Sequence, residues 1–320
     1  MASVFVTSTA ENTRWSPYAR CNYERVLRAA RHDSVGVHSL TADPAQADMI
    51  LFVEANSHFH FDILRSPVYR KFTSKALVFD SQDRAIPLVP GVYLDIPEHL
   101  RNSKIYQYGF YIRVFDNDQL ETFIPHSQCE FLFSFMGKII NCKQVRERVL
   151  ELKHSRALLS DSSSNQADND AKYVDVLQKS KFVICPRGFG ASTWRCFEAM
   201  RAGRVPVIVS DSWFPPAGLN WSEFSLQIPE AAIETIPDVL ERLESDAAAM
   251  GVKARSAWIE NFSLERSFHW LTERCLEVQS QVAANQHLTE RNRWAELSKD
   301  RVARFAKDYI RHMLQPIPSN

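Results

Sequence analysis

The sequence predicts an α/β protein made of two domains with mostly parallel sheets, and two observations lead to this prediction. Short runs of apolar, β-branched residues alternate with segments of helical periodicity, which is typical of parallel strands joined by crossover helices. The chain has 320 residues, a length that suits two domains of ordinary size, each with a core of its own.

The first half of the chain carries three apolar segments of strand length and one segment of helical spacing. Strands are expected at residues 3–8, 49–53 and 76–79, and a helix at residues 18–31. The second and third strand segments are apolar almost throughout, which is typical of strands buried on both faces of a parallel sheet. Ligands bind beyond the carboxyl ends of such strands, so the loops that follow them are candidate sites.

A second apolar strand pattern begins near Phe131, which places the start of another sheet there. We therefore predict an N-terminal Rossmann-like domain at residues 1–125 and a C-terminal Rossmann-like domain at residues 126–263. Residues 264–320 are predicted to form a helical segment, because apolar side chains recur in it at helical spacing. Such helices could also bind a partner or form an oligomer.

Residues 181–230 contain a strand, a glycine loop, a helix and a second strand in that order. Gly188 and Gly190 would let the main chain approach a ligand closely, and Ser192 can cap the helix that follows. Thr193 lies at the same helix start. The free N–H groups and the dipole of a helix N-terminus favour an anion, so the loop is a candidate phosphate site.

Charged side chains around this loop fit a nucleotide diphosphate. Arg187 and Arg195 can bind phosphate oxygens in pairs through their planar guanidinium groups. Glu198 lies three residues after Arg195, on the same helix face, where its carboxylate could accept hydrogen bonds from ribose hydroxyls. The alternative is that Arg195 and Glu198 are only a solvated ion pair. Gly203 is expected to end the helix in a left-handed conformation.

The order of short motifs in this block carries a family resemblance. The motifs are Pro-Arg-Gly at 186–188, Ser-Thr-Trp-Arg at 192–195, Phe-Glu-Ala-Met at 197–200, Gly-x-Val-Pro-Val at 203–207 and Asn-Trp-Ser at 220–222. This combination resembles the exostosin family of glycosyltransferases. Upstream, Asp-Pro-x-x-Ala-Asp at 43–48 and the strand, glycine and arginine within 131–146 are similar to further family segments.

The resemblance implies a GT-B architecture, with two facing Rossmann-like domains, a cleft between them and a C-terminal helix that returns to the first domain. It also implies transfer of a sugar from a nucleotide diphosphate sugar, with UDP as the nucleotide, to a hydroxyl of a saccharide or small-molecule acceptor. Many retaining enzymes of this architecture place a second glutamate eight residues before the ribose-binding one. Position 190 is glycine here, which favours inversion, as does the family resemblance.

Glycosyl transfer requires a clamp on the leaving diphosphate and a base for the acceptor hydroxyl. The cations available for the clamp are Arg187, Arg195, Arg146 and Lys138. Two segments match the Asp-x-Asp metal motif, at residues 116–118 and 168–170, but neither follows an apolar strand. We therefore expect loops at both places, no metal site and no cofactor.

Inversion needs a base on the acceptor side, so the first domain should supply it. We predict Asp83, which follows the strand at 76–79, as this base, and His58 as the alternative. The open alternative for each is an ordinary role in a turn or a helix cap.

Composition and charge restrict the kinds of partner that the protein is expected to bind. Lys plus Arg and Asp plus Glu number 38 each, so no global field attracts nucleic acid or an anionic membrane. A DNA-modifying transferase is therefore disfavoured, whereas a non-catalytic exostosin-like partner or scaffold subunit remains an alternative. We see no apolar window long enough to span a bilayer and no signal-peptide pattern, and six scattered cysteines fit reduced thiols; we expect a cytoplasmic protein.

Overall fold

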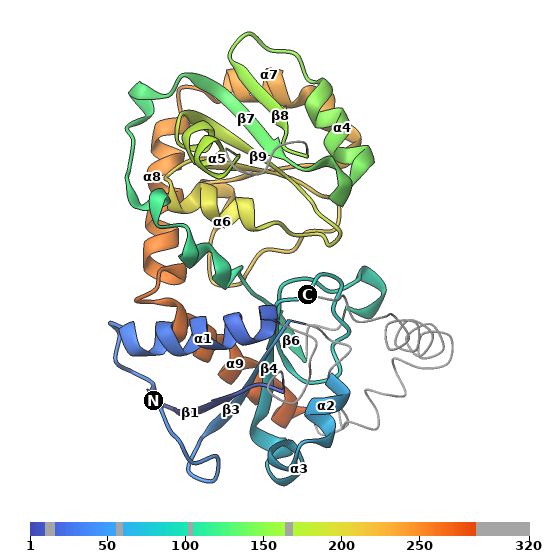
Figure 1. Ribbon diagram of the computed structural model, residues 1–320, viewed down its shortest axis with the longest axis vertical. Helices are drawn as coiled ribbons and strands as arrows, with labels where there is room; N and C mark the ends of the chain where they lie inside the picture. Colours follow the sequence, from blue (N-terminus) through green and yellow to red (C-terminus); the bar gives the residue numbers. More distant parts are fainter. Residues whose placement is uncertain (10–16, 56–59, 102–104, 164–168, 286–320) are drawn as a thin grey trace.

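The computed structural model describes residues 1–9, 17–55, 60–101, 105–163 and 169–285. These residues form two sheets in which all paired strands run parallel (Figure 1). The six-stranded sheet has the order β2-β1-β3-β4-β5-β6, and the five-stranded sheet has the order β11-β10-β9-β7-β8. Each sheet with its helices is called a domain below.

The first sheet uses strands from the first third of the chain. They are β1 (Ser3–Thr7), β2 (Ser39–Leu40), β3 (Met49–Glu54), β4 (Ala76–Asp80), β5 (Gly91–Tyr93) and β6 (Tyr106–Tyr108). The helices among them are α1 (Pro17–His32), α2 (His60–Arg65) and α3 (Pro67–Lys71). Every residue of β3 and β4 is buried, as their apolar sequences require for central strands of a parallel sheet.

The second sheet uses strands between residues 131 and 228. They are β7 (Phe131–Gly137), β8 (Ala157–Asp161), β9 (Ser180–Pro186), β10 (Val205–Val209) and β11 (Leu226–Ile228). The helices of this part are α4 (Lys143–Glu151), α5 (Asn169–Gln178), α6 (Trp194–Arg201), α7 (Ile236–Arg242) and α8 (Ala247–Ala257). Gly203 follows α6 with a φ of 69°, which confirms the expected left-handed helix end.

The chain passes between the domains twice on one side of the molecule, on the left in Figure 1. The first passage includes two short 3₁₀ helices at Ile112–Asp116 and Asp118–Glu121. The second runs from α8 through a π-helical turn, Trp258–Phe262, into α9 (Ser267–Ala284), which packs against α1, β5 and β6 of the first domain. The remainder of the expected C-terminal helices lies outside the described residues.

A cluster of buried aromatic rings fills the space between these passages. The ring of Phe110 lies 5.0 Å from that of Phe262 and 6.3 Å from that of Phe197, centroid to centroid. Trp270 of α9 packs on Phe262 at 5.2 Å. Because aromatic rings bury large apolar areas, this cluster holds the two domains together on that side.

The strands and helices expected within the described residues occur, with ends that differ by at most three residues. The strands β2, β5, β6, β8 and β11 were not predicted. Four of these five have only two or three residues, which is too few to show a periodic pattern. Within the described residues, no helix combines the length and the apolar character needed to cross a bilayer.

Candidate active site

The loop between β9 and α6 lies directly against the first domain. A Cβ atom placed on Gly190 would be 2.4 Å from Oδ2 of Asp95 and 3.0 Å from Oδ1 of Asp83. Asp95 also accepts a hydrogen bond from the main-chain N–H of Ala191. These distances leave no room for a side chain at position 190, so glycine is required there by the close approach of the two domains.

Asp83 and Asp95 follow β4 and β5, at the carboxyl edge of the first sheet. Oδ1 of Asp83 accepts a hydrogen bond from the hydroxyl of Tyr111 at 3.2 Å, and Oδ2 of Asp95 accepts one from the main-chain N–H of Arg84 at 2.8 Å. Burial and then the charge of Asp95 raise the pKa of Asp83 to about 6, although Tyr111 and Arg146 oppose the rise. A carboxylate with this pKa is suited to general base catalysis near neutral pH.

Asp95 was not among the residues predicted from the sequence. Its segment, Val92-Tyr93-Leu94-Asp95, has the same form as Val78-Phe79-Asp80 at the end of β4: apolar residues followed by an aspartate. That repeated pattern at two strand ends was the available signal. Burial raises the pKa of Asp95 as well, although the hydrogen bonds from the main-chain N–H groups of Arg84 and Ala191 oppose the rise.

Arg195 lies in the first turn of α6, and its side chain crosses the carboxyl end of β7. Its Nη2 donates to the main-chain oxygen of Met136 at 2.7 Å, and its guanidinium carbon lies 4.8 Å from the centroid of the Phe135 ring. A Cβ atom on Gly137 would be only 2.5 Å from Nη2. The Nε and Nη1 atoms are buried without a hydrogen-bond partner. Buried donors without a partner are costly, so these two nitrogen atoms are the feature of Arg195 that needs an explanation.

Glu198, one turn further along α6, has internal partners for both carboxylate oxygens. Oε2 accepts a hydrogen bond from the hydroxyl of Tyr173 on α5, and Oε1 accepts one from Nδ2 of Asn117 at 3.4 Å. The side chain therefore faces α5 and the first passage between the domains. It is not a solvated partner of Arg195, since Glu198 is 7% exposed and Arg195 is 5% exposed.

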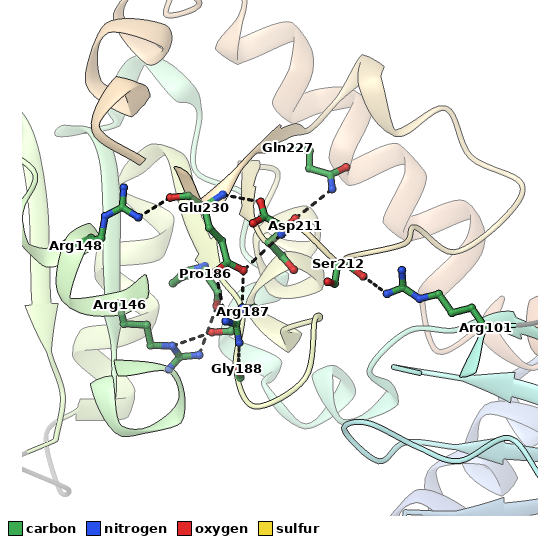
Figure 2. Close-up of polar contacts among 11 residues, drawn as sticks. Arg101, Arg146, Arg148, Pro186, Arg187, Gly188, Asp211, Ser212, Gln227 and Glu230 are labelled. Atoms are coloured by element: carbon green, nitrogen blue, oxygen red, sulfur yellow. Dashed lines mark hydrogen bonds and ion pairs between the residues drawn. The ribbon is translucent and has the colours of Figure 1, made fainter. Parts of the chain in front are cut away.

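Arg187, at the end of β9, forms an ion pair that the sequence analysis did not predict (Figure 2). Its Nε lies 2.6 Å from Oε1 of Glu230, and its Nη2 lies 3.3 Å from Oε2. The main-chain N–H of Glu230 donates to Oδ1 of Asp211 at 2.8 Å. Arg187, Asp211 and Glu230 follow β9, β10 and β11, so three neighbouring strand ends carry this charged group. An acidic residue two positions after the end of each of the last two strands was the signal in the sequence.

Arg146 supports the main chain of the loop, and its guanidinium lies beneath it (Figure 2). It donates to the main-chain oxygens of Lys138 at 2.6 Å, Arg187 at 3.1 Å and Pro186 at 3.5 Å. Burial and the nearby charge of Arg195 lower its pKa to about 10, so it stays charged at neutral pH. The structure thus gives Arg146 a positioning contact, while Lys138 is exposed at the end of β7.

The predicted cap of α6 is wrong in its residue. The N-cap is Thr193, not Ser192, and Thr193 makes no side-chain capping hydrogen bond. Ser192 instead hydrogen-bonds with Tyr111 of the first domain. The helix therefore begins one residue later than expected, at Trp194. At Gly188 an added Cβ would make only ordinary contacts, with Nη2 of Arg146 at 3.8 Å and the main-chain oxygen of Ser192 at 4.0 Å.

His58 lies outside the described residues. A different histidine of the first domain is described: Nε2 of His60 lies 2.9 Å from Oδ2 of Asp80, and both side chains are fully buried. Glu54 at the end of β3 accepts hydrogen bonds from the main-chain N–H and the hydroxyl of Thr9 at 2.6 and 2.9 Å. Burial raises the pKa of Glu54 to about 7.

A second contact between the domains involves the loop after β10. Nη2 of Arg101 donates to the main-chain oxygen of Ser212 at 2.5 Å, as Figure 2 shows. The guanidinium of Arg101 lies 4.2 Å from the ring centroid of Phe214, and that ring stacks on Tyr108 at 5.4 Å. The carboxyl edges of the two sheets therefore touch at two places, the loops after β9 and β10.

The first Asp-x-Asp segment lies in the passage between the domains. The carboxylate of Asp116 forms an ion pair with Arg25 of α1, so its negative charge is balanced within the protein. A cavity of about 370 Å³ lies near this passage, lined by residues that include Phe115, Arg201 and Trp258. None of the predicted site residues lines it, so we place the candidate active site at the contact between the strand ends and not in this cavity. The side chains of the second Asp-x-Asp segment are not described.

Two parallel sheets, each flanked by helices and with their carboxyl edges facing each other, define a GT-B protein with two Rossmann-like domains. Residues 94–243 match the family model of the exostosin GT47 domain, which confirms the resemblance found in the sequence. This chain is thus exostosin-like over the region that contains Asp95, the glycine loop, α6 and Glu230.

Curated relatives match shorter stretches. A protein of Arabidopsis thaliana named as a probable glycosyltransferase is 37% identical over 75 residues, which cover 23% of this chain and 14% of the relative. The exostosin-1 homologue of Caenorhabditis elegans is 35% identical over 81 residues, 23% of this chain and 21% of the relative. Exostosin-1 of Drosophila melanogaster is 28% identical over 90 residues, which cover 26% of this chain and 12% of the relative. The matches therefore span about a fifth or less of each relative.

Solved structures with similar folds share little sequence. A glycosyltransferase of Rickettsia africae superimposes with a TM-score of 0.44 at 10% identity, over 88% of this chain and 98% of that chain. The Anabaena protein HepE, in complex with UDP-glucose, superimposes with a TM-score of 0.42 at 8% identity, over 90% of this chain and 100% of that chain. The sheet topology described above, not these superpositions, carries the fold assignment.

Proposed function

We propose that this protein is a glycosyltransferase that moves a sugar from a nucleotide diphosphate sugar to a hydroxyl of a saccharide or small-molecule acceptor, with inversion and without a metal ion. The exostosin GT47 match supports the reaction class. The observation that carries the proposal is the position of Asp83 and Asp95 against Gly190 in the loop that precedes α6. UDP is proposed as the nucleotide from the family resemblance.

Inversion is supported by the side chains that surround position 190. In many retaining enzymes of this architecture a glutamate stands at the corresponding place, eight residues before the position of Glu198. Here the space beside Gly190 holds carboxylates of the opposite domain. Asp83 would take the proton of the acceptor hydroxyl while that oxygen attacks the anomeric carbon. The bond from that carbon to the diphosphate oxygen breaks at the same time, and the nucleoside diphosphate leaves with the electron pair.

Arg195 is the residue best placed to stabilise the leaving diphosphate. It has two buried nitrogen atoms without partners, and it lies on the first turn of a helix without a side-chain cap. Arg187 is the second cation of the proposed clamp. Its guanidinium group is paired with the carboxylate of Glu230, so a phosphate would have to replace this carboxylate. Arg146 supports the loop through a hydrogen bond to its main chain. Each carboxylate oxygen of Glu198 already accepts one hydrogen bond, so a ribose hydroxyl would have to bind to a remaining lone pair.

The test is binding of UDP, GDP, ADP and dTDP to the full chain by calorimetry with EDTA present. We expect UDP to bind best and Arg195→Ala to weaken this binding. A screen of UDP-sugars for transfer should follow, with Asp83→Asn as the variant that binds UDP but does not turn over. If UDP binds to neither protein, the alternative of a non-catalytic partner subunit is favoured. Turnover that requires an added divalent ion would contradict the metal-independent mechanism.

A further inference from the structure

Two histidines and a glutamate meet at the amino edge of the first sheet, at the far end of its strands from Asp83. His38 immediately precedes β2, and His269 and Glu273 lie on α9. One side-chain ligand atom from each lies within 4.8 Å of the other two. No other group of three potential ligands this close occurs in the part of the chain that the structure describes.

The spacing within α9 directs two of these side chains to one place. His269 and Glu273 are four residues apart, so they share a helix face. The loop that carries His38 runs along the start of α9, where the main-chain N–H of Ser34 donates to the oxygen of Glu265 at 2.9 Å. The main chain thus brings together ligands that are more than 230 residues apart in the sequence.

The separation of His38 and Glu273 suits two ligands of one ion. Nε2 of His38 lies 2.9 Å from Oε1 of Glu273, but neither ring nitrogen of His38 has a hydrogen-bond partner of acceptable direction. Two ligands that share an ion at about 2.0 to 2.1 Å are separated by about 2.9 to 3.4 Å, with the ion off the line that joins them. The observed separation of 2.9 Å falls in this range.

The imidazole rings add to this argument. The rings of His38 and His269 stack with centroids 5.1 Å apart and an angle of 26° between their planes. The side chain of His38 is fully buried, and Nδ1 of His269 is buried without a partner. Burial lowers the pKa of His38, although Glu273 opposes the change. Both ring nitrogens of His38 and Nδ1 of His269 are thus buried without a hydrogen-bond partner in the described structure.

We propose that His38, His269 and Glu273 bind a divalent transition metal ion, with zinc as the ion that best fits two imidazole nitrogens and one carboxylate oxygen. The fourth position would be taken by water. The ion would fasten α9 to the edge of the first sheet. Since this edge is opposite the one that carries Asp83 and Asp95, the role is structural and independent of the proposed transfer reaction.

The experiment uses the full chain, freed of metal with a chelator and then titrated with ZnCl₂. We expect one zinc per chain by calorimetry and by elemental analysis after gel filtration, and an increase of the melting temperature that EDTA reverses. Cobalt(II) should bind in the same place and give visible absorption bands typical of nitrogen and oxygen ligands. The pH dependence should show release of protons, because the ligands must be deprotonated.

Two variants and one matched control decide the assignment. Glu273→Gln keeps the size of the side chain, and His269→Ala removes a half-buried ring; each should reduce zinc affinity at least tenfold and abolish the thermal shift. His154→Ala is the control, because Nε2 of His154 lies 2.9 Å from Oε1 of Glu241 without a third ligand. Unchanged zinc binding in both α9 variants, or no binding by the wild type, would overturn the proposal. Circular dichroism establishes that each variant is folded.

Discussion

Replacing Asp83 with asparagine is expected to stop turnover and leave nucleotide binding unchanged. The carboxylate lies at the contact with the glycine loop, yet it makes no contact with Arg187 or Arg195 that a diphosphate would need. Asparagine has nearly the same shape, but its amide group cannot take the proton from the hydroxyl of the acceptor. Removal of a general base typically costs about 10²- to 10⁴-fold in rate, so kcat should fall by this amount.

The pKa of Asp83 gives a sharper form of this prediction. With a pKa of about 6, about 9% of the side chain is ionised at pH 5 and about 91% at pH 7. The rate should therefore increase about tenfold between these pH values and level off above pH 7. An aspartate with its ordinary pKa would be about 94% ionised at pH 5 and would give an almost flat profile.

Variants of the residues that contact Asp83 serve as controls for the dependence of the rate on pH. Tyr111→Phe removes a hydrogen bond that lowers the pKa of Asp83, so the midpoint should move to higher pH. Asp95→Asn removes a like charge and should move it to lower pH. The assay is the initial rate of nucleoside diphosphate release from pH 4.5 to 8.5 with saturating donor. A midpoint that neither variant moves, or full activity in Asp83→Asn, would refute the role of Asp83.

Three further predictions concern the same structure. Gly190→Ala should destabilise the protein by about 1 to 3 kcal/mol in urea unfolding and reduce turnover, since its Cβ would overlap Oδ2 of Asp95; Gly188→Ala, whose Cβ would make only ordinary contacts, should leave the stability unchanged. Arg195→Ala should weaken UDP binding by about 1 to 3 kcal/mol in calorimetry, and an unchanged Kd would exclude it from the clamp. Glu54 has a raised pKa of about 7, against an ordinary value of 4.5. Its ionisation should therefore remove about 3 kcal/mol of unfolding free energy as the pH rises from 4.5 to above 7; Glu54→Gln should lose this dependence, and identical pH profiles of unfolding would contradict it.

Local sequence patterns determined most of the fold. Apolar segments such as residues 49–53 and 205–209 form central strands of the parallel sheets, because strands of this composition are stable only when both faces are buried. The left-handed Gly203 was also visible, because a helix end in this conformation favours glycine. Gly190 is required by the close approach of Asp95 and Asp83 and not by a left-handed conformation. Short strands such as Gly91–Tyr93 were not visible, because three residues carry too little periodicity.

The tertiary structure decided which charged groups meet. The sequence indicated that Arg187 and Arg195 belong to one loop and helix, but it gave no sign that Glu230 pairs with the first while the second keeps two unpaired nitrogens. Nor did it indicate that Asp83 and Asp95 meet at Gly190, or that His38 lies beside His269 and Glu273. The physical reason is the same in each case. Helical and strand periods are set by neighbours along the chain, whereas a pKa, an ion pair or a metal site depends on distances between segments that only the packed fold brings together.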